Sequence, residues 1–112
     1  MSDCIFCMIG RGEIPASVVY EDDAVLAFDD IAPQAPVHTL IIPRAHYANV
    51  ADGVPSELML RVMEAIPRVA EEKGVAESGY RVIINTGPDA AQSVHHFHVH
   101  VLGGKPMAEG MV

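Results

Sequence analysis

The sequence lacks the features of a membrane-spanning or secreted protein. No hydrophobic run approaches the roughly 18 residues that a membrane-spanning helix needs, and the first residues contain neither a basic region nor a hydrophobic signal core. We therefore expect a soluble, cytoplasmic protein with no membrane partner.

Basic side chains are also scarce. Lys and Arg total 7 against 15 Asp and Glu, which gives a formal net charge of -8. Binding nucleic acid by phosphate neutralisation needs clustered Lys and Arg, so the composition predicts no nucleic-acid partner. A small phosphate ligand remains compatible with this charge, because backbone N–H groups and a few side chains can hold it.

The chain has only 2 cysteines, Cys4 and Cys7, in a Cys-x-x-Cys pair. In a reducing compartment such a pair indicates metal binding or redox chemistry more than a structural disulfide.

A chain of 112 residues, half of them hydrophobic, can enclose one core but not two, so we expect one domain over residues 1–112 with an exposed tail at about 105–112. A short apolar segment at the N-terminus predicts one helical turn. Apolar and β-branched runs predict strands at 17–21, 24–29, 38–43 and 80–85, and the histidine-rich stretch described below supplies a fifth. Together they predict an α+β domain with a mainly antiparallel sheet.

One long helix is predicted between Ser56, its N-cap, and Gly74, which ends it. Apolar residues recur at helical spacing along it, and we interpret the stripe as core packing rather than a ligand surface: Leu58, Met59, Val62, Met63, Ile66, Val69 and Ala70. Pro67 lies inside this helix. An interior proline costs about 3 kcal/mol, so the sequence predicts a bend or break near Val62–Met63.

Four of the 6 histidines fall within residues 95–100, and three of them, His96, His98 and His100, alternate with apolar residues. Successive side chains of a strand point to opposite faces. An extended strand here would carry three imidazoles on one face and apolar side chains, which indicate core, on the other.

Three interpretations of the histidines remain open. They can be structural, although strict alternation beside Gln92–Ser93 would then be an accident. They can bind metal, but His96 and His100 would lie about 13 Å apart along a strand at about 3.3 Å per residue, so other ligands would be needed. They can supply a nucleophile, because a neutral imidazole with a pKa near about 6.5 attacks phosphorus at neutral pH.

The stretch Gln92–Ser93–Val94 followed by His-x-His-x-His resembles the signature of the histidine triad (HIT) family. The likeness extends over nearly the whole chain, through Gln34–Ala35–Pro36, the strand 38–43, Asn85 and Val101–Leu102–Gly103–Gly104. It is greatest to the nucleotide-binding, purine nucleoside phosphoramidase branch, and it implies a HIT-like fold of five strands, one long helix and a short N-terminal helix.

The resemblance implies a homodimeric enzyme that binds purine nucleoside monophosphates. Such an enzyme cleaves the P–N bond of nucleoside 5′-phosphoramidates, including AMP-amine and aminoacyl-AMP compounds, through a covalent nucleotidyl-histidine. It implies His98 as the nucleophile, with His100 and His38 as proton relay, and no cofactor for the chemistry. The implied nucleotide-binding residues are Asp30, Ile31, Phe6, Phe28, Asn85, Ser93 and Val94. The alternatives are a dinucleoside polyphosphate hydrolase and a nucleotide-binding regulatory or scaffold protein with low turnover.

The resemblance also implies a structural Zn²⁺ bound by Cys4, Cys7, His46 and His96, as in some bacterial members of the family. Two thiolates and two imidazoles suit tetrahedral zinc. The alternative is two buried thiols and a surface His46.

The chain departs from the family pattern in three places. Ala90–Ala91 stands where the branch has Gly–Gly, and glycine is used where the backbone approaches a ligand or takes a positive φ. His95 stands at a position that is usually aromatic or hydrophobic, and we expect it to point away from the triad as a packing or interface residue. The tail lacks an aromatic ending, which leaves the preferred leaving group open.

Overall fold

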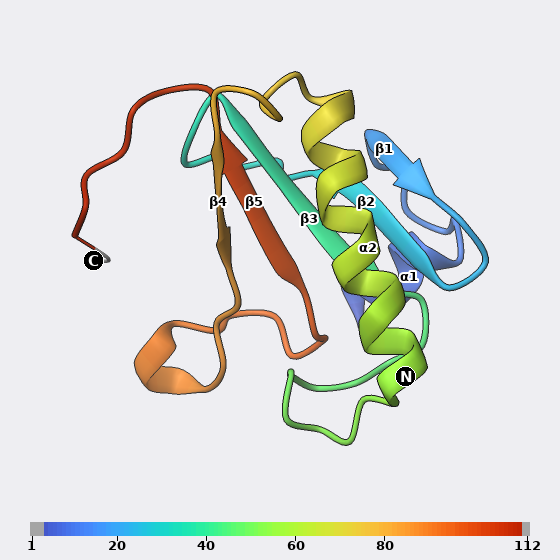
Figure 1. The fold of residues 1–112 in the computed structure, drawn as a ribbon. Helices are drawn as coiled ribbons and strands as arrows, with labels where there is room; N and C mark the ends of the chain where they lie inside the picture. The colour runs from blue at the N-terminus through green and yellow to red at the C-terminus, as the bar shows by residue number, and fades with distance from the viewer. Residues whose placement is uncertain (1–3, 111–112) are drawn as a thin grey trace.

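The computed structural model describes residues 4–110 as one sheet with a long helix on one side (Figure 1). The five strands lie in the order β1-β2-β3-β5-β4, and all neighbouring pairs are antiparallel. This confirms the predicted α+β class. In chain order the elements are α1 (Ile5–Gly10), β1 (Val18–Glu21), β2 (Val25–Asp29), β3 (Val37–Pro43), α2 (Ser56–Glu72), β4 (Tyr80–Ile83), a 3₁₀ helix (Pro88–Ala90) and β5 (Val99–Gly103).

The main core lies between α2 and one face of the sheet (Figure 1). The helix buries Val62, Ala65, Val69 and Ala70 at helical spacing, while Met63 stays exposed. Opposite them, alternate residues of β2, β3 and β5 form the sheet side of this core, with Phe97 completing it: Val25, Ala27, Ile41, Val99 and Val101. No helix in the described part of the chain is long and apolar enough to cross a membrane.

Helix α2 runs without a break through Pro67, so of the predicted bend or break near Val62–Met63 the break is wrong. Pro67 and Met63 both lie on the exposed side of the helix. The carbonyl of Met63, which loses its partner at position 67, therefore faces water rather than the core. Ser56 is the first helical residue and Pro55 precedes it as N-cap, so the predicted cap is displaced by one position. Gly74, with φ +73°, ends the helix as predicted.

The other face of the sheet carries the second apolar cluster and the predicted catalytic histidines. Phe6 of α1 packs there with Leu26, Phe28, Leu40 and Ile42. The register pairs Leu40 with His100 and His38 with Leu102, so His38 and His100 share this face.

The histidine stretch is only partly a strand. β5 begins at Val99, so His96 and His98 precede its paired part. Continuing the register would set Phe97 opposite Pro43, which has no N–H to donate, and β3 ends there. The alternation itself is confirmed, because Phe97, Val99 and Val101 are buried on the helix side.

Most described residues of the predicted tail are exposed, with Met107 half-buried. Arg81 Nη2 of β4 donates to the carbonyl of Ala108 at 2.6 Å. Residues 111–112, included in the predicted tail, lie outside the described part of the chain.

Candidate active site

His38 and His100 form a hydrogen-bonded pair across the two central strands. The backbone N–H of Gln34 donates to His38 Nδ1 at 3.0 Å, which places the proton of a neutral His38 on Nε2. His38 Nε2 then donates to His100 Nδ1 at 2.8 Å. His100 in turn carries its own proton on Nε2. The loop before β3 thus sets the tautomers of both rings.

His98 is oriented by the backbone rather than by another side chain. Its Nδ1 donates to the carbonyl of His96 at 2.7 Å, and a carbonyl can only accept, so the lone pair of a neutral His98 lies on Nε2. The ring is buried, with Phe6 edge-on at 5.2 Å and His100 at 5.0 Å between ring centroids. His98 is therefore held in the tautomer that a nucleophile or base requires.

The surroundings of His100 favour its neutral form. Burial, and then repulsion from His98 and His38, lowers the pKa of His100 to about 4, against the attraction of Asp30. Asp30 Oδ2 lies 3.5 Å from His38 Nε2, and its Oδ1 accepts the backbone N–H of Ala32 at 2.9 Å. His100 is therefore uncharged at neutral pH and can donate from Nε2.

Cys4, Cys7, His46 and His96 form a second cluster, in which one atom from each residue lies within 4.8 Å of the others. Cys4 Sγ lies 3.4 Å and Cys7 Sγ 3.5 Å from His96 Nδ1, and Cys7 Sγ lies 3.3 Å from His46 Nδ1. The two Nδ1 atoms are 3.2 Å apart. Tetrahedral zinc with Zn–S of about 2.3 Å and Zn–N of about 2.0 Å separates its ligands by about 3.3 to 3.8 Å. The four residues therefore fit a zinc ion.

The hydrogen bond at Nε2 of His96 leaves its Nδ1 available to bind a metal ion. His96 Nε2 donates to the carbonyl of Pro43 at 2.9 Å, which leaves the Nδ1 lone pair facing the sulfurs. Burial lowers the pKa of His96, and burial followed by the hydrogen bond with Cys4 raises the pKa of the Cys7 thiol. A cation bound here would displace the thiol protons.

Comparison with known proteins assigns the family. The family model that describes the HIT domain matches residues 11–107 of the sequence. The chain belongs to the HIT family. This confirms the resemblance in the sequence, and the matched range includes the histidine stretch but not Cys4 or Cys7.

The chain is similar to other HIT-family proteins over almost the full length of both chains. It is 47% identical over 108 residues to an uncharacterized HIT-like protein of Synechococcus elongatus, covering 95% of this chain and 94% of that protein. It is 45% identical over 107 residues to the purine nucleoside phosphoramidase of Escherichia coli, covering 94% and 90%. The solved HIT family hydrolase from Clostridium thermocellum superposes with a TM-score of 0.95 at 43% identity, covering 100% and 99%.

The predicted nucleotide-binding residues of the HIT chain fall into two groups. Asp30 and Ile31 follow β2, where Asp30 lies beside His38 and Ile31 is fully exposed. Phe6 and Phe28 are buried, with ring centroids 5.5 Å apart. The second group lies on the loop from β4 to β5 and contains the half-buried Asn85 and Val94 and the exposed Ser93. His95 is exposed, so it is not part of the core, and its expected position at an interface stays a prediction.

Gln92 is the residue whose function the sequence did not reveal. Its buried side chain accepts the Gly87 N–H at 3.0 Å and donates to the carbonyls of Ala48 at 2.8 Å and Val94 at 3.1 Å. It thus ties the loop that carries Ser93 to the loop that carries His46. The family motif includes Gln92, but the hydrogen-bond partners of the Gln92 side chain lie on loops that the sequence does not show to be close together.

Ala91, one position earlier, adopts the left-handed conformation with φ 59°. The expectation that glycine suits this part of the HIT chain is therefore justified by the backbone. Ala91 closes the 3₁₀ helix, with its N–H bonded to the carbonyl of Pro88.

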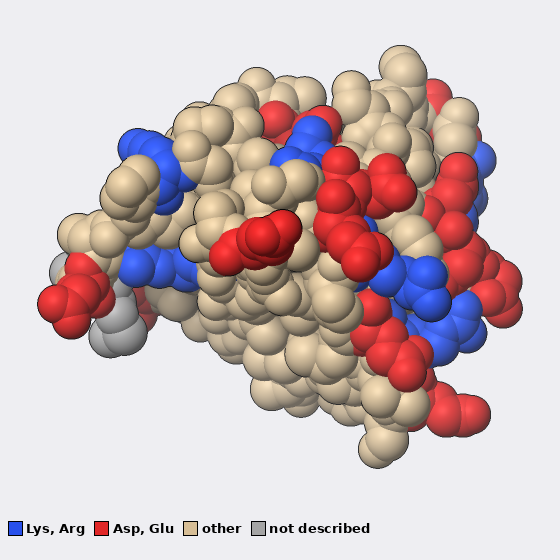
Figure 2. Space-filling model, turned by 45° about the horizontal axis from the view of Figure 1, so that its top comes forward, with Lys and Arg blue, Asp and Glu red and all other residues tan. Residues whose placement is uncertain are grey.

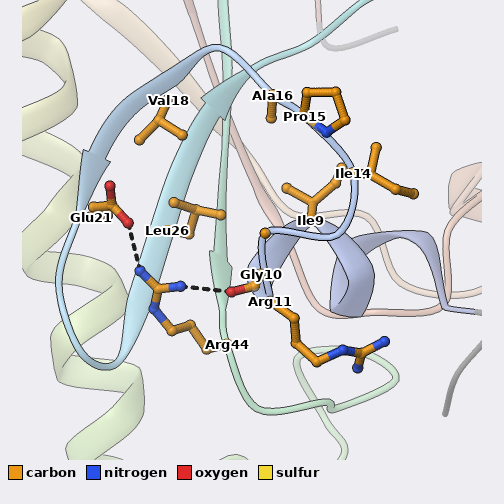
Figure 3. A pocket seen from close by; sticks show the side chains of 11 residues that line it. Ile9, Gly10, Arg11, Ile14, Pro15, Ala16, Val18, Glu21, Leu26 and Arg44 are labelled. Atoms are coloured by element: carbon orange, nitrogen blue, oxygen red, sulfur yellow. Dashed lines mark hydrogen bonds and ion pairs between the residues drawn. The ribbon is translucent and has the colours of Figure 1, made fainter.

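A separate cavity of about 400 Å³ lies between α1, the 11–16 loop and strands β1 and β2 (Figure 3). Arg44 lines it and donates to the Gly10 carbonyl, the Asp22 carbonyl and Glu21 Oε1. None of the predicted site residues is among those lining this cavity. The candidate site is therefore defined by the histidines and their hydrogen bonds rather than by this hollow.

Proposed function

We propose that this HIT-family chain is a hydrolase that cleaves the P–N bond of purine nucleoside 5′-phosphoramidates through a covalent nucleotidyl-His98 intermediate. The hydrogen bond from His98 Nδ1 to the His96 carbonyl at 2.7 Å carries the proposal, because it leaves Nε2 with the lone pair that attacks phosphorus. The name of the Escherichia coli relative supports the choice of substrate class.

In the first step, His98 Nε2 bonds to the α-phosphorus and the P–N bond breaks, with its electron pair staying on nitrogen. The nitrogen takes the proton that it needs from solvent, and the His38–His100 pair orients the departing amine, since His100 donates a hydrogen bond from Nε2 while its Nδ1 accepts one from His38. In the second step, water attacks the phosphorus and releases His98, and the proton that the water loses goes to solvent. The net change adds one water across the P–N bond.

The nucleotide would lie between the two groups of binding residues. Asp30 would accept hydrogen bonds from the ribose hydroxyls, and the exposed Ile31 with Phe6 and Phe28 would contact the base. Ser93, Asn85 and the backbone at Val94 would hold the phosphoryl oxygens and stabilise the developing charge. The buried rings of Phe6 and Phe28 lower the local dielectric and would strengthen electrostatic interactions beside them.

Cys4, Cys7, His46 and His96 would hold a structural Zn²⁺, which would cross-link segments of the chain without bonding to the substrate. Protein purified without chelator should contain zinc, and Cys4→Ser should reduce the content. Absence of zinc together with thiols that titrate freely would refute the site.

We also propose a homodimer formed through β4. This strand is an edge of the sheet, and its side chains on the helix side, Tyr80, Val82 and the following Ile84, are exposed along with Leu60 and Met63 of α2. The lower half of Figure 2 shows a broad uncharged area on the side where α2 lies over the sheet. An unpaired apolar edge strand is a template for pairing with a second copy.

Steady-state kinetics on an AMP-linked amine and on diadenosine polyphosphates test the function. We expect a higher kcat/KM for the P–N substrate, and loss of turnover in His98→Ala with retained AMP binding. His95→Ala, an exposed neighbour, should behave as the unaltered chain. Preference for the polyphosphate would favour the dinucleoside hydrolase, and tight binding without His98-dependent turnover would favour a regulatory protein.

A further inference from the structure

We propose that Cys4, Cys7, His46 and His96, hereafter the Cys/His cluster, position the nucleophile, so that metal loading controls the tautomer and orientation of His98. The inference rests on the proposed zinc site and on His98 as the nucleophile. It assigns the cluster a positioning function in the reaction beyond stabilising the fold.

His98 precedes the strand that should hold it. Because β5 begins at Val99, residues 96–98 depend on individual contacts instead of a ladder of paired hydrogen bonds. Such a segment is held only as firmly as the groups that it contacts.

The first contact comes from His96 itself. Its carbonyl accepts the His98 Nδ1 proton at 2.7 Å, while its own ring is in the cluster with Nδ1 facing the sulfurs and Nε2 bonded to Pro43. Metal at Nδ1 would fix the ring, and the fixed ring holds the backbone whose carbonyl sets the His98 tautomer.

The other two contacts also come from segments that carry ligands. Phe6 lies between Cys4 and Cys7 on α1, and its ring meets His98 edge-on at 5.2 Å and His96 at 5.9 Å. The backbone N–H of Phe97 donates to the carbonyl of Tyr47, the residue after His46, at 2.6 Å. Each segment that the metal would join therefore makes a contact with residues 96–98.

The proposed coupling between metal binding at the Cys/His cluster and the orientation of His98 predicts a spectroscopic change at His98. With histidine ¹⁵N-labelled, Zn²⁺-loaded protein should give one protonated Nδ1 signal for His98 that exchanges slowly with water. Chelation, or His46→Ala, should broaden or remove this signal and lower kcat about 10- to 100-fold, the usual effect of losing support around a reacting group. His95→Ala should change neither.

Replacement of Zn²⁺ by Cd²⁺ separates positioning from folding, because Cd²⁺ fills the same ligands with longer bonds. If chelation unfolds the domain, comparison of the Zn²⁺ and Cd²⁺ forms still shows whether the metal positions His98. With Cd²⁺ we expect changed NMR chemical shifts at His96, Phe97 and His98 and a lower kcat. The amide chemical shifts of Val99 and Val101 and the Kd for AMP should stay unchanged.

The outcomes separate the proposals. Zinc that binds without any change at His98 between loaded, metal-free and Cd²⁺ forms overturns the coupling but leaves the metal site. Protein that binds neither metal overturns both. A His98 signal that follows metal loading in a protein without P–N hydrolysis supports the coupling and overturns the proposed function.

Discussion

The histidines of one alternating stretch differ because each has a different partner. His98 donates from Nδ1 to a backbone carbonyl, His100 accepts at Nδ1 from another imidazole, and His96 donates from Nε2 and turns Nδ1 to two sulfurs. The proposed nucleophile, relay and metal ligand are therefore distinguished by their hydrogen bonds, although the residue type is the same.

The low pKa of His100 predicts a dependence of stability on pH. The folded value of about 4 lies below the ordinary 6.5, so between these values the unfolded chain binds a proton that the folded chain does not. The free energy of unfolding should therefore fall as the pH is lowered from about 6.5 towards 4. Urea unfolding across this range measures the slope.

His100→Asn is the matched variant for this measurement, because it keeps a side chain able to hydrogen-bond and removes the titration. The unaltered chain and His100→Asn share all other acid-sensitive groups. The difference between their slopes of unfolding free energy against pH therefore measures the contribution of His100. Equal slopes would contradict the assigned pKa.

Ala91→Gly should stabilise the chain. A residue with a β-carbon at φ 59° costs about 1–2 kcal/mol, and glycine removes this cost while adding about 0.5–1 kcal/mol of unfolded-state entropy. We expect thermal or urea unfolding to report a gain of up to about 1 kcal/mol. Ala90→Gly, in the adjacent 3₁₀ helix, should instead lower stability, and a loss in both variants would argue against strain at Ala91.

At the scale of elements, periodicity predicted most of the fold. The strands, the long helix and the apolar side of the histidine stretch follow from spacing that burial enforces. Two predictions were wrong or incomplete because they depended on neighbours. β3 ends at Pro43, which leaves His98 without strand pairing, and Pro67 lies on the side of α2 that faces water.

The candidate site was less accessible to sequence reasoning than the fold. The family motif brought His38, His98 and His100 forward, and the structure places them together. The carbonyls of His96, Pro43 and Ala48 carry no sequence signal, because any residue supplies a carbonyl. Gln92 acquires its function only when two loops meet.

Gln92→Leu tests how firmly that amide holds the loops. The variant leaves the Gly87 N–H and the carbonyls of Ala48 and Val94 without their side-chain partner, and a buried unpaired group costs about 1–3 kcal/mol. We expect unfolding to become easier by about 2 kcal/mol or more. Gln34→Leu, at an exposed glutamine, should change stability by less than about 0.5 kcal/mol. Similar effects in both variants would contradict the assigned function of Gln92.

At the scale of the whole molecule, the two sheet edges differ. β1 at one edge packs against α2, whereas β4 at the other leaves Val82 40% exposed on the helix side. Val82→Glu would place a charge in the proposed dimer contact. We expect the mass from sedimentation equilibrium to fall from two subunits to one.

Val18→Glu is the control, because Val18 is similarly exposed on the opposite edge. It should leave the dimer intact. A single-subunit mass for the unaltered chain, or dissociation by both variants, would remove the β4 interface.

Trapping the covalent intermediate tests most directly whether His98 is the nucleophile. The chain is mixed with an AMP-linked amine, quenched within the first turnover under alkaline conditions, digested and sequenced by tandem mass spectrometry. We expect a nucleotidyl group on His98, within the peptide that also contains His95, His96 and His100. An adduct on any other residue, or rapid product formation with none on His98, would contradict it.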